Sequence, residues 1–159
     1  MAYPSPIGWH ELSTKGVDGT MFRAVPLAGG SVLLTSEKGA ALFRGEPLVG
    51  TATSPMSRAR RHPALVALGD GRALAIGGRP DAKRPPLASC EFFDPASATW
   101  RPAPQLSVAR EDHAAVAVGD RILVIGGKDA DGRTLDSVEA WTPGDTLALL
   151  NLTRLYRMD

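Results

Sequence analysis

Basic side chains gather in two short stretches of this 159-residue sequence, and their types are suited to holding an acidic group. A guanidinium group can donate two parallel hydrogen bonds to one carboxylate or phosphate, so clustered arginines favour an anionic partner. The net charge of the whole chain is only +1, because 18 Lys and Arg are balanced by 17 Asp and Glu. The chain as a whole therefore does not attract anionic partners over a long range. Any electrostatic binding must therefore be local. The candidate binding residues are Arg58, Arg60, Arg61, Arg79, Lys83, Arg84 and Arg110.

The same basic residues also have a structural interpretation. Runs of charge on loops are commonly solvated or paired within the chain, and exposed ion pairs contribute little stability. Arg60 and Arg110 recur at equivalent places in the sequence, which favours a role inside the fold for these two. Acidic residues follow Arg110 at Glu111 and Asp112, so ion pairs within the chain can form there. Both interpretations stay open at the level of sequence.

Residue types that carry out catalysis or bind metals lack a supporting pattern. His62 and His113 are interpreted as equivalent positions of a repeat, with His10 as a third, and no second ligand at metal-binding spacing accompanies them. Cys90 lies in an apolar run, where a small buried side chain is expected and not a nucleophile. Residues 128–132 resemble the start of a calcium loop, but Val138 stands where that loop needs Glu. The sequence predicts no catalytic residue, metal site or cofactor.

The elements that position the basic residues follow from an internal repeat. Glycine pairs at 77–78 and 126–127 are 49 residues apart, and a Ser-x-Glu motif follows each pair at 89–91 and 137–139. A fainter copy over residues 22–43 lacks both motifs. A fixed period of about 50 residues is typical of repeat architectures. We therefore interpret the chain as three repeats, of which the first is degenerate.

Each repeat contains short runs rich in Val, Ile, Leu and Phe that are bounded by Gly-Asp turns. This pattern predicts strands joined by tight hairpins, with four strands to a repeat. In such an antiparallel unit, the loop before the first strand and the loop after the second lie at the same end, which brings the two basic stretches together. The expected strands are 64–68, 72–76, 89–93 and 99–101 in the second repeat, and 114–118, 121–125, 137–141 and 146–150 in the third.

The order of these landmarks resembles the kelch repeat. The resemblance covers about residues 57–145 and implies an all-β fold, a β-propeller of four-stranded blades around a central channel. It also implies a scaffold that binds other proteins through loops at one mouth. Ser36-Glu37 departs from the pattern where a glycine pair belongs, and so does Leu147 near the expected last tryptophan. The matching residues are His62, Gly77, Gly78, Glu91, Phe93, Asp94 and Trp100, then His113, Gly126, Gly127, Ser137, Glu139 and Trp141.

The length of the chain conflicts with a closed ring. One kelch-like domain over residues 1–159, with repeats near 9–56, 57–106 and 107–159, supplies about three blades, whereas propellers close with ~4 to 8. We therefore predict a propeller arc that is half of a six-bladed ring, closed by a second copy of the chain. A strand at Trp9 is expected to complete the partner's last blade. Closure by a complementary propeller protein, or a chain that is a fragment of a longer one, stays open.

The predicted function is that of a non-enzymatic protein-binding or assembly module that recognises an acidic partner segment. No exposed pattern of basic and aromatic residues indicates nucleic-acid binding, and no run of ~18 apolar residues indicates a membrane span. A single cysteine and an N-terminus without an apolar run favour the cytoplasm. Two alternatives stay open. The resemblance also implies sugar-active enzymes, which here would use His62 and His113, and the chain could be a structural half-propeller subunit of a hetero-complex.

Overall fold

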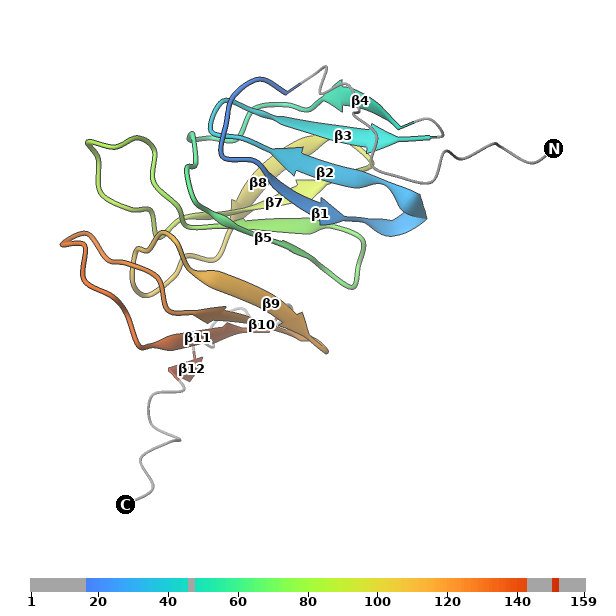
Figure 1. Ribbon diagram of the computed structural model, residues 1–159. Coiled ribbons are helices and arrows are strands. Elements are labelled where there is room, and N and C mark those ends of the chain that lie inside the picture. Colours follow the sequence, from blue (N-terminus) through green and yellow to red (C-terminus); the bar gives the residue numbers. More distant parts are fainter. Residues whose placement is uncertain (1–16, 46–47, 143–149, 152–159) are drawn as a thin grey trace, which may run out of the picture.

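Three four-stranded antiparallel sheets form the part of the chain that the computed structural model describes, which is residues 17–45, 48–142 and 150–151. Figure 1 shows them side by side as a fan, in chain order. We call them blades 1, 2 and 3.

Blade 1 contains β1 (Arg23–Pro26), β2 (Val32–Thr35), β3 (Ala40–Arg44) and β4 (Val49–Ala52). Blade 2 contains β5 (Ala64–Ala67), β6 (Ala73–Ile76), β7 (Cys90–Asp94) and β8 (Thr99–Ala103). Blade 3 contains β9 (Ala114–Val118), β10 (Arg121–Ile125), β11 (Val138–Trp141) and β12 (Leu150–Asn151).

The all-β fold and the four-stranded repeat are confirmed. The strands of blades 2 and 3 begin and end within two residues of their predicted bounds, apart from the last. That strand was expected over 146–150, and only its end at Leu150 falls on described residues, within β12. The expected strand at Trp9 lies outside the described residues. A short 3-10 turn (Ala28–Gly30) joins β1 to β2, and among the described residues no helix is long and apolar enough to cross a membrane.

Each blade is a meander in which every strand pairs with its neighbour in the sequence. In blade 2 the register places Leu65 opposite Ala75 and Val66 opposite Leu74, so alternate residues face the two neighbouring blades. Because both faces of a blade are covered, its central strands need apolar residues at every position. All four residues of β6 are buried accordingly.

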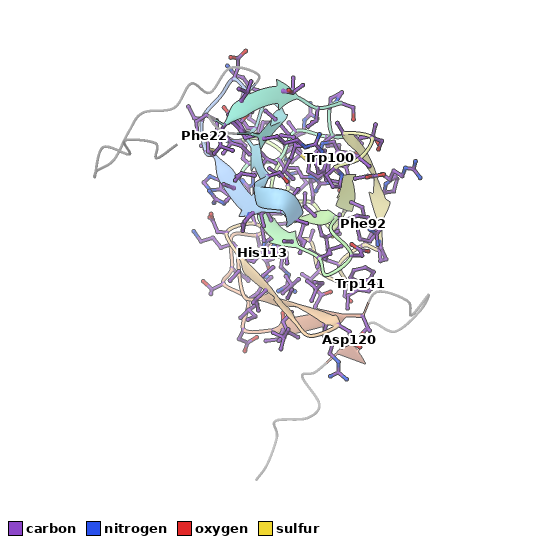
Figure 2. All side chains as sticks on the ribbon, turned by 90° about the vertical axis from the view of Figure 1, so that its right-hand side faces the viewer. Phe22, Phe92, Trp100, His113, Asp120 and Trp141 are labelled. Atoms are coloured by element: carbon purple, nitrogen blue, oxygen red, sulfur yellow. The ribbon has the colours of Figure 1, made fainter. Side chains whose placement is uncertain are left out.

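The seam between blades 1 and 2 is an apolar core. Val25, Leu33 and Leu42 of blade 1 pack against Ala73 and Phe93 of blade 2. The indole of Trp100 in β8 lies 5.0 Å from the ring of Phe93, centroid to centroid, and its Nε1 donates a hydrogen bond to Thr53 beside β4. Figure 2 shows Trp100 in the upper part of the molecule, beside blade 1.

The seam between blades 2 and 3 repeats this arrangement with the equivalent residues. Val66, Leu74 and Ile76 of blade 2 pack against Ile122 and Val124 of blade 3. The rings of Phe92 and Trp141 approach to 5.5 Å across the seam, and Figure 2 shows them close together. The repeat therefore encodes one packing face toward the preceding blade and one toward the following blade.

The glycine pair of blade 2 allows blade 3 to approach closely. Gly77 has a φ of +56°, and a Cβ at this position would lie 2.6 Å from the carbonyl oxygen of Arg110 and 2.9 Å from the ring of His113. The N–H of Gly78 donates to the same carbonyl at 2.9 Å. Any side chain at Gly77 would therefore separate the two blades.

Replacing Gly77 with alanine is expected to lower the free energy of unfolding by about 2 kcal/mol more than replacing Gly132, in a urea titration. Both glycines have left-handed φ angles, where alanine costs roughly 1–2 kcal/mol, but nothing lies within 4 Å of a Cβ built at Gly132. The difference therefore measures the crowding at the seam. Equal losses for the two variants would show that Gly77 is required only for its backbone angle.

Blade 1 lacks the glycine pair and closes its loop by other contacts. Ser36 stands at the first glycine position and donates through Oγ to the carbonyl of Asp18, while Glu37 accepts hydrogen bonds from the N–H and hydroxyl of Thr20. Gly19 lies against Ser36, where a Cβ would come within 2.8 Å of its hydroxyl. The degenerate repeat therefore keeps the loop geometry with a different set of polar contacts.

Candidate protein-binding surface

The two basic stretches of blade 2 meet at one end of the sheet, as the antiparallel order predicts. The backbone of Arg61, before β5, exchanges two hydrogen bonds with that of Arg79, after β6, at 2.7 and 2.8 Å. In blade 3 the equivalent pairing joins Glu111 to Lys128. Figure 1 shows the long loops that follow β6 and β10 projecting at the same end of the molecule, on its left-hand side. We call this end the mouth.

Arg60 is buried and binds the end of its own blade. Its guanidinium donates to the carbonyls of Gly77 and Ser89 at 2.8 and 2.7 Å, to the Ser89 hydroxyl, and to Glu91 at 2.8 Å. Glu91 also accepts from the N–H and hydroxyl of Ser57. Burial opposes ionisation of Glu91, but these hydrogen bonds outweigh it and hold the pKa below its ordinary value. Glu91 therefore stays charged beside Arg60.

Arg110 makes the same contacts in blade 3. It donates to the carbonyls of Gly126 and Ser137, to the Ser137 hydroxyl, and to Glu139 at 2.6 Å. Arg60 and Arg110 are 1% and 0% exposed. This corrects the sequence prediction, which placed both among the partner-binding residues, because neither guanidinium is accessible to another molecule. The structural interpretation of these two arginines is the one that holds.

Three of the predicted residues, Arg58, Lys83 and Arg84, are exposed at the mouth. Arg58 and Arg84 border a groove of about 430 Å³, together with Pro80 and Pro85. Arg84 pairs with Asp81 at 3.1 Å but keeps 68% of its side chain exposed. Among the described residues no carboxylate pairs with Arg58 or Lys83. We call this the basic groove.

Arg61 and Arg79 lie nearer the blade seams and are half-buried. Arg79 pairs with Glu111 of blade 3 at 2.7 Å, and Arg61 Nε lies 3.3 Å from the sulfur of Met21 in the loop before β1. The structure thus brings Arg79 and Arg61 close to the basic groove, but it uses their side chains to join neighbouring blades. The mouth of blade 3 is neutralised in a similar way, because Arg133 pairs with Asp131 and Lys128 approaches Asp112 to 3.8 Å.

The two histidines do not occupy equivalent positions. Counted from the buried arginine of each repeat, His62 corresponds to Asp112, and His113 corresponds to Pro63. His62 and Asp112 share a left-handed φ, at 51° and 54°. They also pair with each other across the seam, with Nδ1 of His62 3.0 Å from the carboxylate. The predicted equivalence of His62 and His113 is therefore wrong by one residue.

His113 is buried at the seam between blades 2 and 3, near the centre of the view in Figure 2. Within the described part of the chain, neither of its ring nitrogens has a hydrogen-bond partner. Burial, with a further contribution from the nearby charge of Arg110, lowers its pKa from 6.5 to about 4. His113 is therefore neutral near pH 7 and packs as an uncharged ring.

The free energy of unfolding is expected to fall by about 2 kcal/mol between pH 7.5 and pH 5. Unfolded His113 takes up a proton near pH 6.5, whereas the folded residue does so only near pH 4, so the unfolded state binds more protons in this window. Urea titrations across the pH range measure this change. His113→Leu should flatten the dependence. A wild-type stability that is constant over this range would contradict the burial of a neutral His113.

Other candidate chemical groups stay within the fold. Burial raises the pKa of the Cys90 thiol to about 11, which makes a thiolate nucleophile unavailable near neutral pH. Asp129, in the segment that resembles a calcium loop, accepts hydrogen bonds from the N–H groups of Asp131 and Arg133 and so forms a turn. Across residues 17–45, 48–142 and 150–151 no group of three His, Cys, Asp or Glu could hold a metal ion.

The buried network gives each landmark of the repeat a physical role. Arg110 reaches the glycine pair and the Ser-x-Glu motif, and residues 109–145, which contain all of these, match the family model of the Kelch motif. Residues 109–145 therefore carry a Kelch motif. The basic groove lies on the loops of blade 2, which has the same buried arginine, glycine pair and Ser-x-Glu landmarks as blade 3.

Curated kelch proteins resemble parts of this chain. Kelch-like protein 33 of Homo sapiens is 38% identical over 90 residues, which cover 57% of this chain and 16% of that protein. The Kelch repeat protein M-T8 of Myxoma virus is 40% identical over 43% of this chain and 13% of that protein. The F-box/kelch-repeat protein At5g39560 of Arabidopsis thaliana is 35% identical over 54% and 22%. The matched part of this chain thus spans less than a quarter of each relative.

Solved structures share the kelch-like arrangement of blades. The structure of YjhT aligns with a TM-score of 0.70 at 15% identity, over 87% of this chain and 47% of that one. A fungal alcohol oxidase solved in complex with copper aligns with a TM-score of 0.68 at 20% identity, over 82% of this chain and 32% of that one. At these identities the likeness shows the fold alone, and this chain spans less than half of either neighbour.

Sequence reasoning missed the acidic partners of the two repeated arginines. Glu91 and Glu139 were recognised as landmarks, but their pairing with Arg60 and Arg110 was not. The available signal was that an arginine and a glutamate recur together in both complete repeats while blade 1 lacks both. Covariation of two opposite charges within a repeat indicates an internal ion pair.

Proposed function

We propose that this kelch chain is a protein-binding module that holds an acidic segment of its partner in the basic groove. The observation that carries this proposal is that Arg58 and Arg84 border one groove with exposed side chains, and that Lys83 is exposed on the same loop as Arg84. Arg79 and Arg133, at the same mouth, are paired with Glu111 and Asp131. Arginine side chains that keep free donors can bind a carboxylate with two hydrogen bonds. The relatives are named as kelch proteins. The resemblance to kelch repeats implies a scaffold that binds other proteins through loops at one mouth, and this agrees with the proposed role.

The shape of the basic groove also favours an extended peptide. Pro80, Pro85, Pro86 and Leu87 line the groove with the two arginines and supply apolar surface, and Gln105 adds a side-chain amide. A peptide backbone could lie against the prolines while an acidic side chain reaches Arg58 or Arg84. Asp81 limits the charge of the groove, since it accepts hydrogen bonds from the N–H groups of Lys83 and Arg84.

A labelled peptide rich in glutamate, titrated against the 159-residue chain by fluorescence anisotropy, tests the proposal. We expect the double variant Arg58→Ala/Arg84→Ala to weaken binding at least about tenfold, because two exposed charge contacts are lost. The matched control, Arg101→Ala/Arg121→Ala, removes two exposed arginines that lie on β8 and β10 and should leave the affinity unchanged.

Salt separates specific charge contacts from other binding. Affinity for the acidic peptide should fall as the salt concentration rises, because exposed charges are screened beyond ~8 Å at physiological ionic strength. Two outcomes would overturn the proposal: an affinity that does not change with salt, or equal losses for the two double variants. The first would assign binding to apolar contacts, and the second to net charge alone.

We further propose that the three repeats, near residues 9–56, 57–106 and 107–159, form one kelch domain that works as part of a closed propeller. The ring would be completed by a second copy of the chain or by a complementary propeller protein, and the cytoplasm stays the predicted compartment. Three blades are fewer than the ~4 to 8 that close a ring. The completed ring would present the basic groove beside its central channel.

A further inference from the structure

Blade 3 ends in an apolar face that the described chain leaves uncovered. Val116, Val118 and Ile125 point to this face and are 45%, 54% and 43% exposed. The equivalent residues of blade 2 include Val66, which is only 6% exposed because blade 3 covers it. In Figure 1, blade 3 forms the lower part of the fan. The repeat has therefore built a blade-packing face with no blade upon it.

Blade 1 ends in the opposite kind of packing face. Ala24, Pro26, Val32 and Leu34 occupy the positions that blades 2 and 3 use to contact the blade before them. Ala24 and Pro26 are exposed, and Val32 and Leu34 are half-buried beside a small cluster formed with Val17. A single chain thus carries both halves of a blade interface, one at each end of the fan.

We propose that the occupant of the blade 3 face is blade 1 of a second copy of this chain, so that two chains close a six-bladed ring. This rests on the proposed completion of the ring and names its partner. The new contact continues an interface that the chain already forms twice, at both of its internal seams. Six blades fall within the range of closed propellers, and a rotation of 180° about the ring axis relates the two chains.

The backbone at the mouth of blade 3 agrees with this closure. At the internal seam, the N–H of Gly78 donates to the carbonyl of Arg110 in the next blade. Gly127 is the equivalent donor of blade 3, and no described residue accepts from it. In a second copy, the residue equivalent to Arg110 is Gly19, because Gly19 lies four residues before β1 as Arg110 lies four residues before β9. The same rotation places the two basic grooves on one face of the ring.

Light scattering after size-exclusion chromatography tests the proposal on the 159-residue chain. We expect a mass twice the 16.7 kDa of one chain. Val116→Glu should reduce the mass to that of a monomer, because it places a charge on the apolar blade 3 face. Val49→Glu is the matched control, since Val49 is 63% exposed on β4 and lies on neither end face, and it should stay dimeric. A monomeric wild-type chain, or an open polymer, would overturn the proposal.

A mixture of two variants that are each unable to dimerise provides a second test, in which the mass of the mixture is measured and the result does not depend on a single substitution. Ala24→Lys should also abolish the dimer, because Ala24 lies on the blade 1 face that would contact blade 3 of the other chain. Val66 and Ala115, which are the residues equivalent to Val116 and Ala24, belong to one cluster at the internal seam. A mixture of Val116→Glu and Ala24→Lys chains then forms one Glu–Lys interface and one wild-type interface. We expect the mixture to recover the double mass, and failure to do so would contradict head-to-tail closure.

These outcomes are separate from those of the basic groove. Monomers that bind the acidic peptide as the groove proposal expects would reject only the closed ring. A dimer that shows no difference between the two arginine double variants would reject only the groove. If a complementary propeller protein were the partner, the purified wild-type chain would fail to reach the double mass.

Discussion

Replacing Arg110 with methionine is expected to lower the free energy of unfolding by about 3–5 kcal/mol, one of the two largest effects that we expect of a single substitution. The change removes the guanidinium that pairs with Glu139 at 2.6 Å, and the side chain of Glu139 is only 5% exposed. A buried carboxylate without its partner is strongly destabilising. The carbonyls of Gly126 and Ser137 lose a donor in the same step. Urea titration at a fixed chain concentration measures the loss.

Arg133→Met is the matched control for Arg110→Met. Arg133 pairs with Asp131 at 2.8 Å, but 77% of its side chain is exposed, so its replacement should cost less than about 1 kcal/mol. The double variant Arg110→Met/Glu139→Leu should be more stable than the sum of its single changes, because it leaves no unpaired buried charge. If Arg110→Met cost no more than Arg133→Met, the buried network could not be what holds the mouth loops of blade 3.

Replacing Phe93 with alanine is expected to cost about 3–5 kcal/mol as well. Phe93 is fully buried at the seam between blades 1 and 2, in contact with Trp100 and the apolar residues of blade 1. Its removal loses the transfer free energy of the ring and leaves a cavity that two rigid sheets cannot fill. The same urea titration measures the effect, and a lower m-value would indicate that the seam has loosened.

Phe22→Ala controls for the loss of an aromatic ring as such. Phe22 is 41% exposed in the loop before β1, at the top of Figure 2, and its truncation should cost below about 1 kcal/mol. Similar losses for Phe22→Ala and Phe93→Ala would contradict the assignment of the main core to the blade seams.

The strands of blades 2 and 3 were predictable because their signals are local. Apolar runs separated by Gly-Asp turns fix the hairpins, and the glycine pair marks the end of the second strand in each complete repeat. The predicted equivalence of the two histidines was wrong although the same local signals could have corrected it. A histidine lies near the start of each repeat, and that likeness concealed a shift of one residue. The expected strand starts at 64 and 114 already place His62 opposite Asp112, and the observed starts of β5 and β9 confirm this correspondence.

The sequence predicted where the candidate site lies, but not which of the basic residues are exposed there. Antiparallel pairing brought the two basic stretches together at the mouth, as the loop order requires. Which arginines are exposed depends on where carbonyls and carboxylates lie in three dimensions, and Arg60 and Arg110 point inward to satisfy them. Spacing in a sequence does not report the direction of a long side chain. The exposed set therefore reduces to Arg58, Lys83 and Arg84, with Arg61 and Arg79 at its edge.

Hydrogen exchange of the kelch chain with and without the glutamate-rich peptide tests the central claim most directly, because it locates the bound segment. We expect slower exchange in residues 57–61 and 79–88, the two loops that form the basic groove, and unchanged exchange in the loops of blade 3 beyond residue 128. Protection confined to the exposed face around Val116, or no protection at saturating peptide, would contradict a binding site in the basic groove.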